Sequence, residues 1–219
     1  MIEALNWYKQ VSPNKMRVGQ LEEIVKVVPE FPFESIYCIE TGASQNWDDG
    51  GVGSFFAKAC ELSGGEFHSV DVFENVVTKS AKFYSELGLR VNHYIQDSVK
   101  FLKETDVVPN LVHLDSWDLN LKDPFPSALH GWEEFKAIED KMPVGSILIV
   151  DDNFFKGTWV TWNYTNGGKS ERIDINYPIV GKGSNIWSFV ESGKSNWKKL
   201  SKDIAGPNVK LVYQKISSS

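Results

Sequence analysis

A chain of 219 residues is long enough to bury one hydrophobic core and short for two, which favours a single domain. Its formal net charge of −6, without any run of lysine or arginine, argues against nucleic acid as the main partner. Neither a signal-peptide core nor an apolar run near the ~20 residues that span a bilayer is present, so we expect no membrane association. Cys38 and Cys60 lie in apolar runs typical of buried free thiols, which favours a cytoplasmic protein.

Strand-like and helix-like segments alternate along the first 155 residues. The strand-like runs are short and rich in β-branched or aromatic residues, and the segments between them have apolar residues at helical spacing. The predicted strands are 35–40, 66–72, 91–96, 110–115 and 146–151, and the predicted helices are 18–28, 53–62, 74–87, 97–104 and 127–142. Because parallel strands need crossover helices, this alternation predicts an α/β fold with a Rossmann-like, doubly wound, mostly parallel sheet.

The pattern weakens after residue 155. Aromatic and polar residues make 159–178 loop-like, a helix is expected near 183–192, and two more strands are expected at 197–201 and 209–216. The last of these alternates with a period of two and is predicted to be an antiparallel edge strand. Seven strands with an antiparallel last strand are therefore expected.

We expect one domain to span residues 1–219. Residues 1–33 would form an N-terminal helical extension, and residues 154–180 would form a loop on the substrate side of the sheet, since they follow the fifth strand directly.

Every predicted parallel strand ends in acidic or amide side chains. Ligands of open parallel sheets bind outside the carboxyl ends of the strands, so these side chains are expected to share one edge. They are Glu40, Asp71, Gln96 with Asp97, Asp115, and Asp151 to Asn153.

The first three strand ends predict a nucleoside-type site. Glycines 42, 50, 51 and 53 let the backbone after Glu40 pass close to a ligand. Asp71 ends the next strand, where a carboxylate accepts hydrogen bonds from both hydroxyls of a ribose. Asp97 and Ser98 would meet an adenine edge. Taken singly, Asp71 is better explained as a solvated strand end, and the glycine loop lacks the G-x-G-x-x-G pattern.

The last two strand ends predict a metal site. Carboxylates from Asp115, Asp151 and Asp152, with Asn153 beside them, are oxygen ligands suited to Mg²⁺. No cluster of cysteine and histidine favours zinc. Asp-Asp-Asn also suits a plain turn after a strand. The metal prediction requires the three carboxylates to face one ion, and a lysine between them would undermine it and the transferase interpretation together.

These segments together resemble a known family. The runs "IYCIETGAS…GGVGS", "HSVDVFE", "IQDSVKFL", "LVHLDSWDL" and "GSILIVDDN", between about residues 35 and 155, resemble class I S-adenosylmethionine (SAM)-dependent methyltransferases. They are most similar to the metal-dependent O-methyltransferases of the catechol and macrocin type. The resemblance implies SAM and Mg²⁺ as cofactors and a small hydroxylated acceptor, such as a sugar or a catechol-like ring.

The resemblance also assigns residues to the two halves of the site. The implied metal ligands are Asp115, Asp151 and Asp152. The implied cofactor-binding residues are Glu40, Thr41, Gly42, Ala43, Ser44, Gly53, Ser54, Asp71, Val72, Gln96, Asp97, Ser98 and Asp115.

Two features depart from the family pattern. The loop "SQNWDDGG" is longer than the usual glycine turn. Catechol enzymes carry a lysine base three residues after the first metal ligand, and this chain has Asp118 there. The expected mechanism has the metal lower the pKa of an acceptor hydroxyl, whose proton Asp118 or His130 removes before in-line attack on the methyl group.

Other functions fit the same residues. A metal-dependent hydroxylase- or hydrolase-like relative would use the same carboxylates to activate water. A SAM- or nucleotide-binding module without catalysis is a second alternative. A nicotinamide dehydrogenase is disfavoured by the missing glycine motif. The sequence leaves open the identity of the acceptor and whether the chain forms a homo-oligomer.

Overall fold

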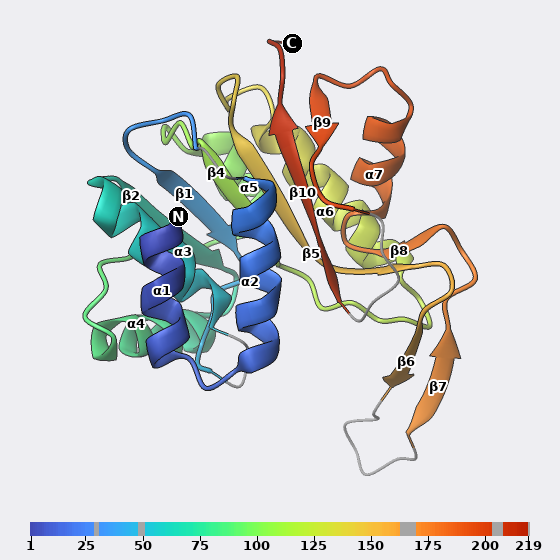
Figure 1. Cartoon of the computed structure of the whole chain (residues 1–219), viewed down its shortest axis with the longest axis horizontal. Helices are drawn as coiled ribbons and strands as arrows, with labels where there is room; N and C mark the ends of the chain where they lie inside the picture. Colours follow the sequence, from blue (N-terminus) through green and yellow to red (C-terminus); the bar gives the residue numbers. More distant parts are fainter. Residues whose placement is uncertain (29–30, 48–50, 163–169, 203–207, 219) are drawn as a thin grey trace.

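The computed structural model describes residues 1–219 except 29–30, 48–50, 163–169, 203–207 and 219. Gly50 and part of the predicted 154–180 loop therefore lie outside the described residues. A central sheet is covered by helices on both faces (Figure 1). The helices are α1 (Ile2–Val11), α2 (Lys15–Val27), α3 (Val52–Ser63), α4 (Glu74–Glu86), α5 (Ser98–Glu104), α6 (Phe125–Ile138) and α7 (Ser184–Glu191). The strands are β1 (Tyr37–Thr41), β2 (Glu66–Asp71), β3 (Asn92–Ile95), β4 (Leu111–Leu114), β5 (Ile147–Phe155), β6 (Trp159–Trp162), β7 (Glu171–Asp174), β8 (Ile179–Gly181), β9 (Trp197–Lys199) and β10 (Val209–Lys215).

The main sheet has the strand order β3-β2-β1-β4-β5-β10-β9, with β8 also paired to β5. Strands β1 to β5 are parallel to one another, and β10 is antiparallel to both β5 and β9. The prediction of a Rossmann-like, mostly parallel sheet with an antiparallel last strand is confirmed. The predicted edge position of the last strand is wrong, because β10 is inserted between β5 and β9.

The position of β10 follows from its side chains. Leu211 and Tyr213 pack into the core on one face of the sheet, and Val212 packs into the core on the other. A strand with apolar residues on both faces belongs inside a sheet. The alternation was therefore a sign of two buried faces, not of an exposed edge.

Residues 154–180, predicted as a loop, are mostly strand where they are described. β5 continues to Phe155, β6 and β7 form an antiparallel hairpin, and β8 returns to pair with the end of β5. The hairpin projects from the body of the molecule in Figure 1. The helix predicted at 127–142 lies at 125–138, and it begins with Phe125 and Pro126 because proline suits the first turn of a helix.

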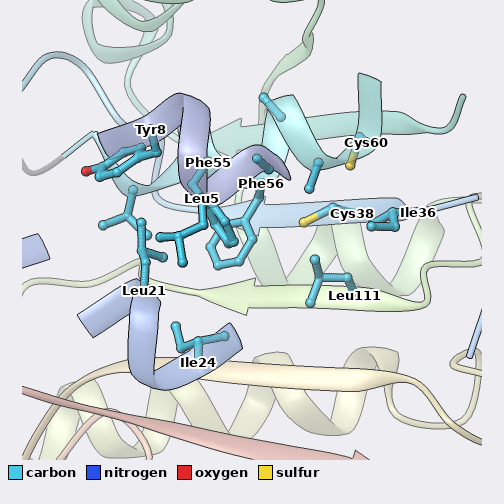
Figure 2. Packing of buried hydrophobic residues seen from close by; sticks show 14 of the residues in the cluster. Leu5, Tyr8, Leu21, Ile24, Ile36, Cys38, Phe55, Phe56, Cys60 and Leu111 are labelled. Atoms are coloured by element: carbon cyan, nitrogen blue, oxygen red, sulfur yellow. The ribbon is translucent and has the colours of Figure 1, made fainter. Parts of the chain in front are cut away.

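Two apolar layers hold the helices to the sheet. Helices α1 to α4 pack on one face, and Figure 2 shows Leu5 and Tyr8 of α1 beside Phe55 and Phe56 of α3. Helices α5, α6 and α7 pack on the other face. Alternate residues of β5 enter opposite layers, which leaves the end of this strand fixed from both sides.

Cys38 and Cys60 are both buried and unpaired, as predicted. Within the described ranges of the chain, no helix combines the length and the hydrophobicity that crossing a membrane requires.

Candidate functional site

A cavity of about 600 Å³ opens at the carboxyl ends of the parallel strands. Most of its wall comes from the segments that directly follow β1, β2, β3 and β4 and from residues of β2 and β5. Eleven residues predicted from the sequence line it: Gly42, Ala43, Ser44, Asp71, Val72, Asp97, Ser98, Asp115, Asp118, His130 and Asp152. One cavity therefore joins the predicted nucleoside half of the site to the predicted metal half.

Six other predicted residues do not line this cavity: Glu40, Thr41, Gly53, Ser54, Gln96 and Asp151. Most of them lie directly beneath it in the core, and Gln96 instead donates a hydrogen bond to Glu104 near the surface. Among the described residues of 154–180, none lines the cavity, so the expected acceptor wall is not formed by that segment.

Glu40 is fully buried and organises the loop above it. Its carboxylate accepts hydrogen bonds of 3.3 Å from the hydroxyls of Ser44, Ser69 and Tyr84. The Nδ1 atom of His113 lies 3.3 Å from the same carboxylate. A buried carboxylate needs several such donors because burial removes its water. Glu40 therefore fixes Ser44 at the cavity wall and does not line the cavity itself.

The turn after β1 needs glycine at position 42. Gly42 has φ of 79°, and a Cβ there would lie 2.6 Å from the backbone oxygen of Asp115. Next to this turn, Asp71 accepts a hydrogen bond of 3.2 Å from the N–H of Ala43 and one of 2.9 Å from the N–H of Phe73. These two bonds hold the Asp71 carboxylate at the cavity wall and leave lone pairs on both oxygens.

Asp97, Ser98 and His130 form the wall at the end of β3. Asp97 caps α5 by accepting a hydrogen bond of 2.9 Å from the N–H of Lys100. The Ser98 hydroxyl lies 3.0 Å from Nε2 of His130, and the ring of Trp117 lies 5.1 Å from the His130 ring. Burial would lower the pKa of His130, but the hydrogen bond and charge of Glu134 outweigh it and raise that pKa.

Two lysines pair with the three predicted metal ligands. The Nζ atom of Lys182 lies 2.7 Å from Oδ1 of Asp115 and 2.9 Å from Oδ2 of Asp152. Asp151 is buried and forms an ion pair with buried Lys210. The charges of Lys210 and His113 hold the pKa of Asp151 well below its usual range despite its burial.

These pairs do not fit a magnesium site. Single ligand atoms of His113, Asp115 and Asp151 do lie within 4.8 Å of one another, which is close enough for one ion. However, Mg²⁺ needs unoccupied oxygen ligands at about 2.0–2.1 Å, and the facing oxygens already bind ammonium groups. Burial and the neighbouring carboxylates raise the pKa of Asp115 to about 7, although Lys182 opposes this change.

Several residues of the cavity were missed in the sequence. They are Arg17, Gln45, Val70, Phe73, Val76, Ser116, Trp117 and Lys182. Phe73, Ser116 and Trp117 are direct neighbours of predicted strand ends, so proximity in the chain could have indicated them. Arg17 comes from α2 and Lys182 follows β8, and no local pattern indicates either of them.

No protein-family model matches the sequence, and no curated protein matches it. Solved structures do match the fold. A SAM-dependent methyltransferase from Clostridium acetobutylicum has a TM-score of 0.56 and 10% identity, over 97% of each chain. An rRNA methylase from Streptococcus thermophilus has a TM-score of 0.55 and 11% identity, over 90% of this chain and 97% of that one.

A protein from Streptococcus mutans, assigned to the methyltransferases and solved in complex with SAH, has a TM-score of 0.56 and 11% identity. This match covers 90% of the present chain and 98% of the other. All three similarities extend over nearly the whole sheet and its helices. The chain therefore has the fold of the SAM-dependent methyltransferases.

Proposed function

We propose that this protein transfers the methyl group of SAM to a hydroxyl group of a small acceptor. The observation that carries the proposal is the single cavity at the carboxyl ends of the strands, in a fold shared with SAM-dependent methyltransferases. Part of its wall is formed by Gly42, Asp71 and Ser98, which the sequence assigned to the methionine, ribose and adenine parts of the cofactor. A cytoplasmic setting, where both buried thiols stay reduced, agrees with this proposal.

The cofactor would extend along the ends of β1, β2 and β3. The turn at Gly42 to Ser44 lines the cavity and would pass the methionine part, because a glycine there lets the backbone approach a ligand closely. Asp71 would accept hydrogen bonds from the ribose hydroxyls with its remaining lone pairs. Ser98 and the exposed ring of Trp117 would contact the adenine.

The transfer needs one base and little other chemistry, because the sulfonium already activates the methyl group. The acceptor oxygen forms a bond to the methyl carbon, and the carbon–sulfur bond breaks with its electron pair going to sulfur. The hydroxyl proton goes to a base at the cavity, for which Asp118 and His130 are the candidates. Asp118 is exposed there, whereas Nε2 of His130 lies close to Ser98 and Glu134, which favours Asp118.

Magnesium is not part of the proposal. The residues that the resemblance assigns to the metal are paired with Lys182 and Lys210. The hydrolase-like alternative depends on the same metal and loses support for the same reason. The proposal depends instead on the cofactor half of the cavity, which those lysines do not occupy.

RNA is the competing acceptor, because the Streptococcus thermophilus neighbour is an rRNA methylase. An RNA backbone is bound through lysine and arginine, and here the chain carries a net charge of −6. Three exposed or half-buried acids, Asp71, Asp97 and Asp118, also line the cavity. A small acceptor therefore fits the charge of this protein better than RNA does.

Calorimetric titration of the full chain with SAM and with SAH tests the cofactor assignment. We expect one site for each, and at least about tenfold weaker binding in Asp71→Asn, because an amide accepts fewer hydrogen bonds from the ribose. Glu86→Gln removes a surface acid of α4 and should bind as the wild type does. Absence of SAM binding in the wild type would exclude the proposed function.

Methyl transfer is then measured with labelled SAM against a panel of hydroxylated small molecules and a structured RNA. Transfer to a small molecule, lost in Asp118→Asn with SAM binding retained, is the expected result. Transfer to RNA alone would replace the small acceptor with RNA. Tight SAM binding without transfer to any acceptor would instead support a SAM-binding module.

A further inference from the structure

The ammonium group of Lys182 is surrounded by the carboxylates that would otherwise bind a metal. It donates hydrogen bonds to Oδ1 of Asp115 at 2.7 Å and to the backbone oxygen of Asp115 at 2.8 Å. Its third contact is Oδ2 of Asp152 at 2.9 Å. An ammonium has three N–H groups, so these three contacts use all of them. The lysine side chain is only 4% exposed, whereas that of Asp115 is 31% exposed, so the ammonium is buried beneath carboxylates that reach the cavity.

Two glycines hold Lys182 in this place. Gly181 pairs with Asn153 of β5, and a Cβ on Gly181 would lie 2.0 Å from the backbone oxygen of Asp152. On the other side, the N–H of Gly183 donates a hydrogen bond of 2.8 Å to the side-chain oxygen of Asn153. The backbone of Lys182 is therefore fixed directly against β5, within reach of Asp115 and Asp152.

The local charges are balanced without a metal. Asp115 and Asp152 share Lys182, and Asp151 is paired with Lys210. Arg17 approaches Asp151 to 3.8 Å as well. A divalent cation bound here would lie beside two ammonium groups and would have to displace their hydrogen bonds.

We propose that Lys182 takes the place of the divalent cation, so that this protein transfers methyl groups without a metal. The inference rests on the proposed methyltransferase function. Lys182 is a positioning residue: it holds Asp115 at the cavity wall, where the acceptor hydroxyl donates a hydrogen bond to it. Among the described residues, Oδ2 of Asp115 has no hydrogen-bond partner, so that oxygen is open to the acceptor.

The replacement of the metal ion by Lys182 has a consequence for the choice of acceptor. A metal ion is chelated best by two neighbouring hydroxyls, whereas a single carboxylate oxygen needs only one hydroxyl. Acceptors with a single hydroxyl should therefore be methylated as well as matched compounds with two neighbouring hydroxyls.

Manganese titration of the full chain, followed by the electron paramagnetic resonance signal of free Mn²⁺, tests the proposal without any acceptor. We expect no binding to the wild type below about 1 mM and no change in its melting temperature with Mg²⁺. A single Mn²⁺ site in the wild type that is lost in Asp152→Asn would overturn the proposal.

The variant Lys182→Met removes the ammonium and keeps an unbranched side chain of similar length. It leaves Asp115 and Asp152 facing each other, so we expect a lower melting temperature that Mn²⁺ or Mg²⁺ restores. Lys9→Met makes the same change in net charge at an exposed ion pair with Glu22 and should gain no such response. A folded Lys182→Met that binds no Mn²⁺ would count against the proposal.

Lys182→Arg keeps a cation in place, so its melting temperature should not respond to divalent ions. This variant provides a second test if Lys182→Met does not fold. The wild-type titration requires no variant at all. SAM calorimetry separates the two proposals: wild-type Mn²⁺ binding with normal SAM binding would refute only the role of Lys182. Absence of SAM binding in the wild type, without any Mn²⁺ binding, would instead refute the methyltransferase function.

Discussion

At the scale of single residues, the site depends on groups that lie beneath the cavity as much as on those that line it. Glu40 is the best example, since it is fully buried and contacts Ser44, Ser69 and Tyr84. Gly53 of α3 lies directly against this carboxylate. The shape of the loop after β1 is therefore set from beneath by the carboxylate of Glu40 and by Gly53, which has no side chain and so leaves room for that carboxylate.

Gly53→Ala should damage both stability and cofactor binding. An added Cβ would lie 2.2 Å from the Tyr84 hydroxyl and 2.4 Å from Oε1 of Glu40, so the network must move. We expect a loss of about 1–3 kcal/mol in the free energy of unfolding, as is typical of overpacked cores. Weaker SAM binding should accompany it, because Ser44 moves with Glu40. Urea denaturation and calorimetry measure the two effects.

Gly19→Ala is the matched control. Gly19 lies within α2, and an added Cβ would meet no atom within 4 Å. Alanine is the better helix former, so this variant should gain up to about 1 kcal/mol and bind SAM unchanged. Equal stability of the two alanine variants would contradict the close packing described at Gly53.

At the scale of elements, lysine side chains cap the C-terminal ends of two helices that pack on the same face of the sheet. Lys141 donates hydrogen bonds to the backbone oxygens of Leu102, Lys103 and Thr105 at the end of α5. Buried Lys215 of β10 does the same for Glu139 and Met142 just beyond α6. Carbonyl groups at helix ends have no partner within the helix, and a cation there also suits the helix dipole.

Lys215→Met should lower the free energy of unfolding by about 2–4 kcal/mol, because two buried carbonyls lose a charged donor. SAM binding should stay unchanged, since Lys215 lies at the end of the sheet opposite the cavity. Lys198→Met removes an exposed lysine from β9 and is the control, with a change below about 0.5 kcal/mol. A comparable loss in both variants, measured in urea, would argue against the capping role.

At the scale of the whole molecule, the parallel half of the sheet was predictable and the metal half of the site was not. Apolar runs and helical spacing are local signals, so β1 to β5 and their terminal acids were located from the sequence. The partners of Asp115, Asp151 and Asp152 depend on how residues after 155 fold back onto β5. Lys182 follows β8 and Lys210 lies on β10, and no local pattern pairs them with those acids.

The predicted metal site required its carboxylates to face one ion with no lysine between them. This requirement is not met, because Lys182 lies between Asp115 and Asp152. The methyltransferase interpretation does not fail with it, since neither the fold nor the part of the cavity at the ends of β1 to β3 depends on a metal. Strand-end acids in such a sequence predict where a site lies more securely than they predict its ligand.

The pH dependence of global stability should report on Asp115. Its pKa is raised to about 7 in the folded protein, whereas an unfolded chain has the ordinary value of about 3.9. The folded state therefore holds a proton that the unfolded state releases between these values, and this residue lowers stability as pH rises through the window.

Urea denaturation of the wild type and of Asp115→Asn at pH values from 4 to 8 measures this effect. The variant cannot ionise, so its stability relative to the wild type should increase steadily with pH. Titrating groups remote from Asp115 act alike in both proteins and cancel in the comparison. A difference that stays constant across the range would contradict the raised pKa.

The acidic end of β5 is completed by segments from opposite ends of the chain. Arg17 of α2 and Lys210 of β10 both approach Asp151, and Gln20 donates a hydrogen bond of 2.8 Å to the backbone of Asn208. A ribosome that has made only the first two hundred residues has therefore produced the carboxylates without the ammonium group that neutralises Asp151. During synthesis, the buried carboxylate of Asp151 should therefore lack its lysine partner until β10 emerges, and a chain that stops before β10 should also lack the strand that pairs with Ile147 to Val150 of β5.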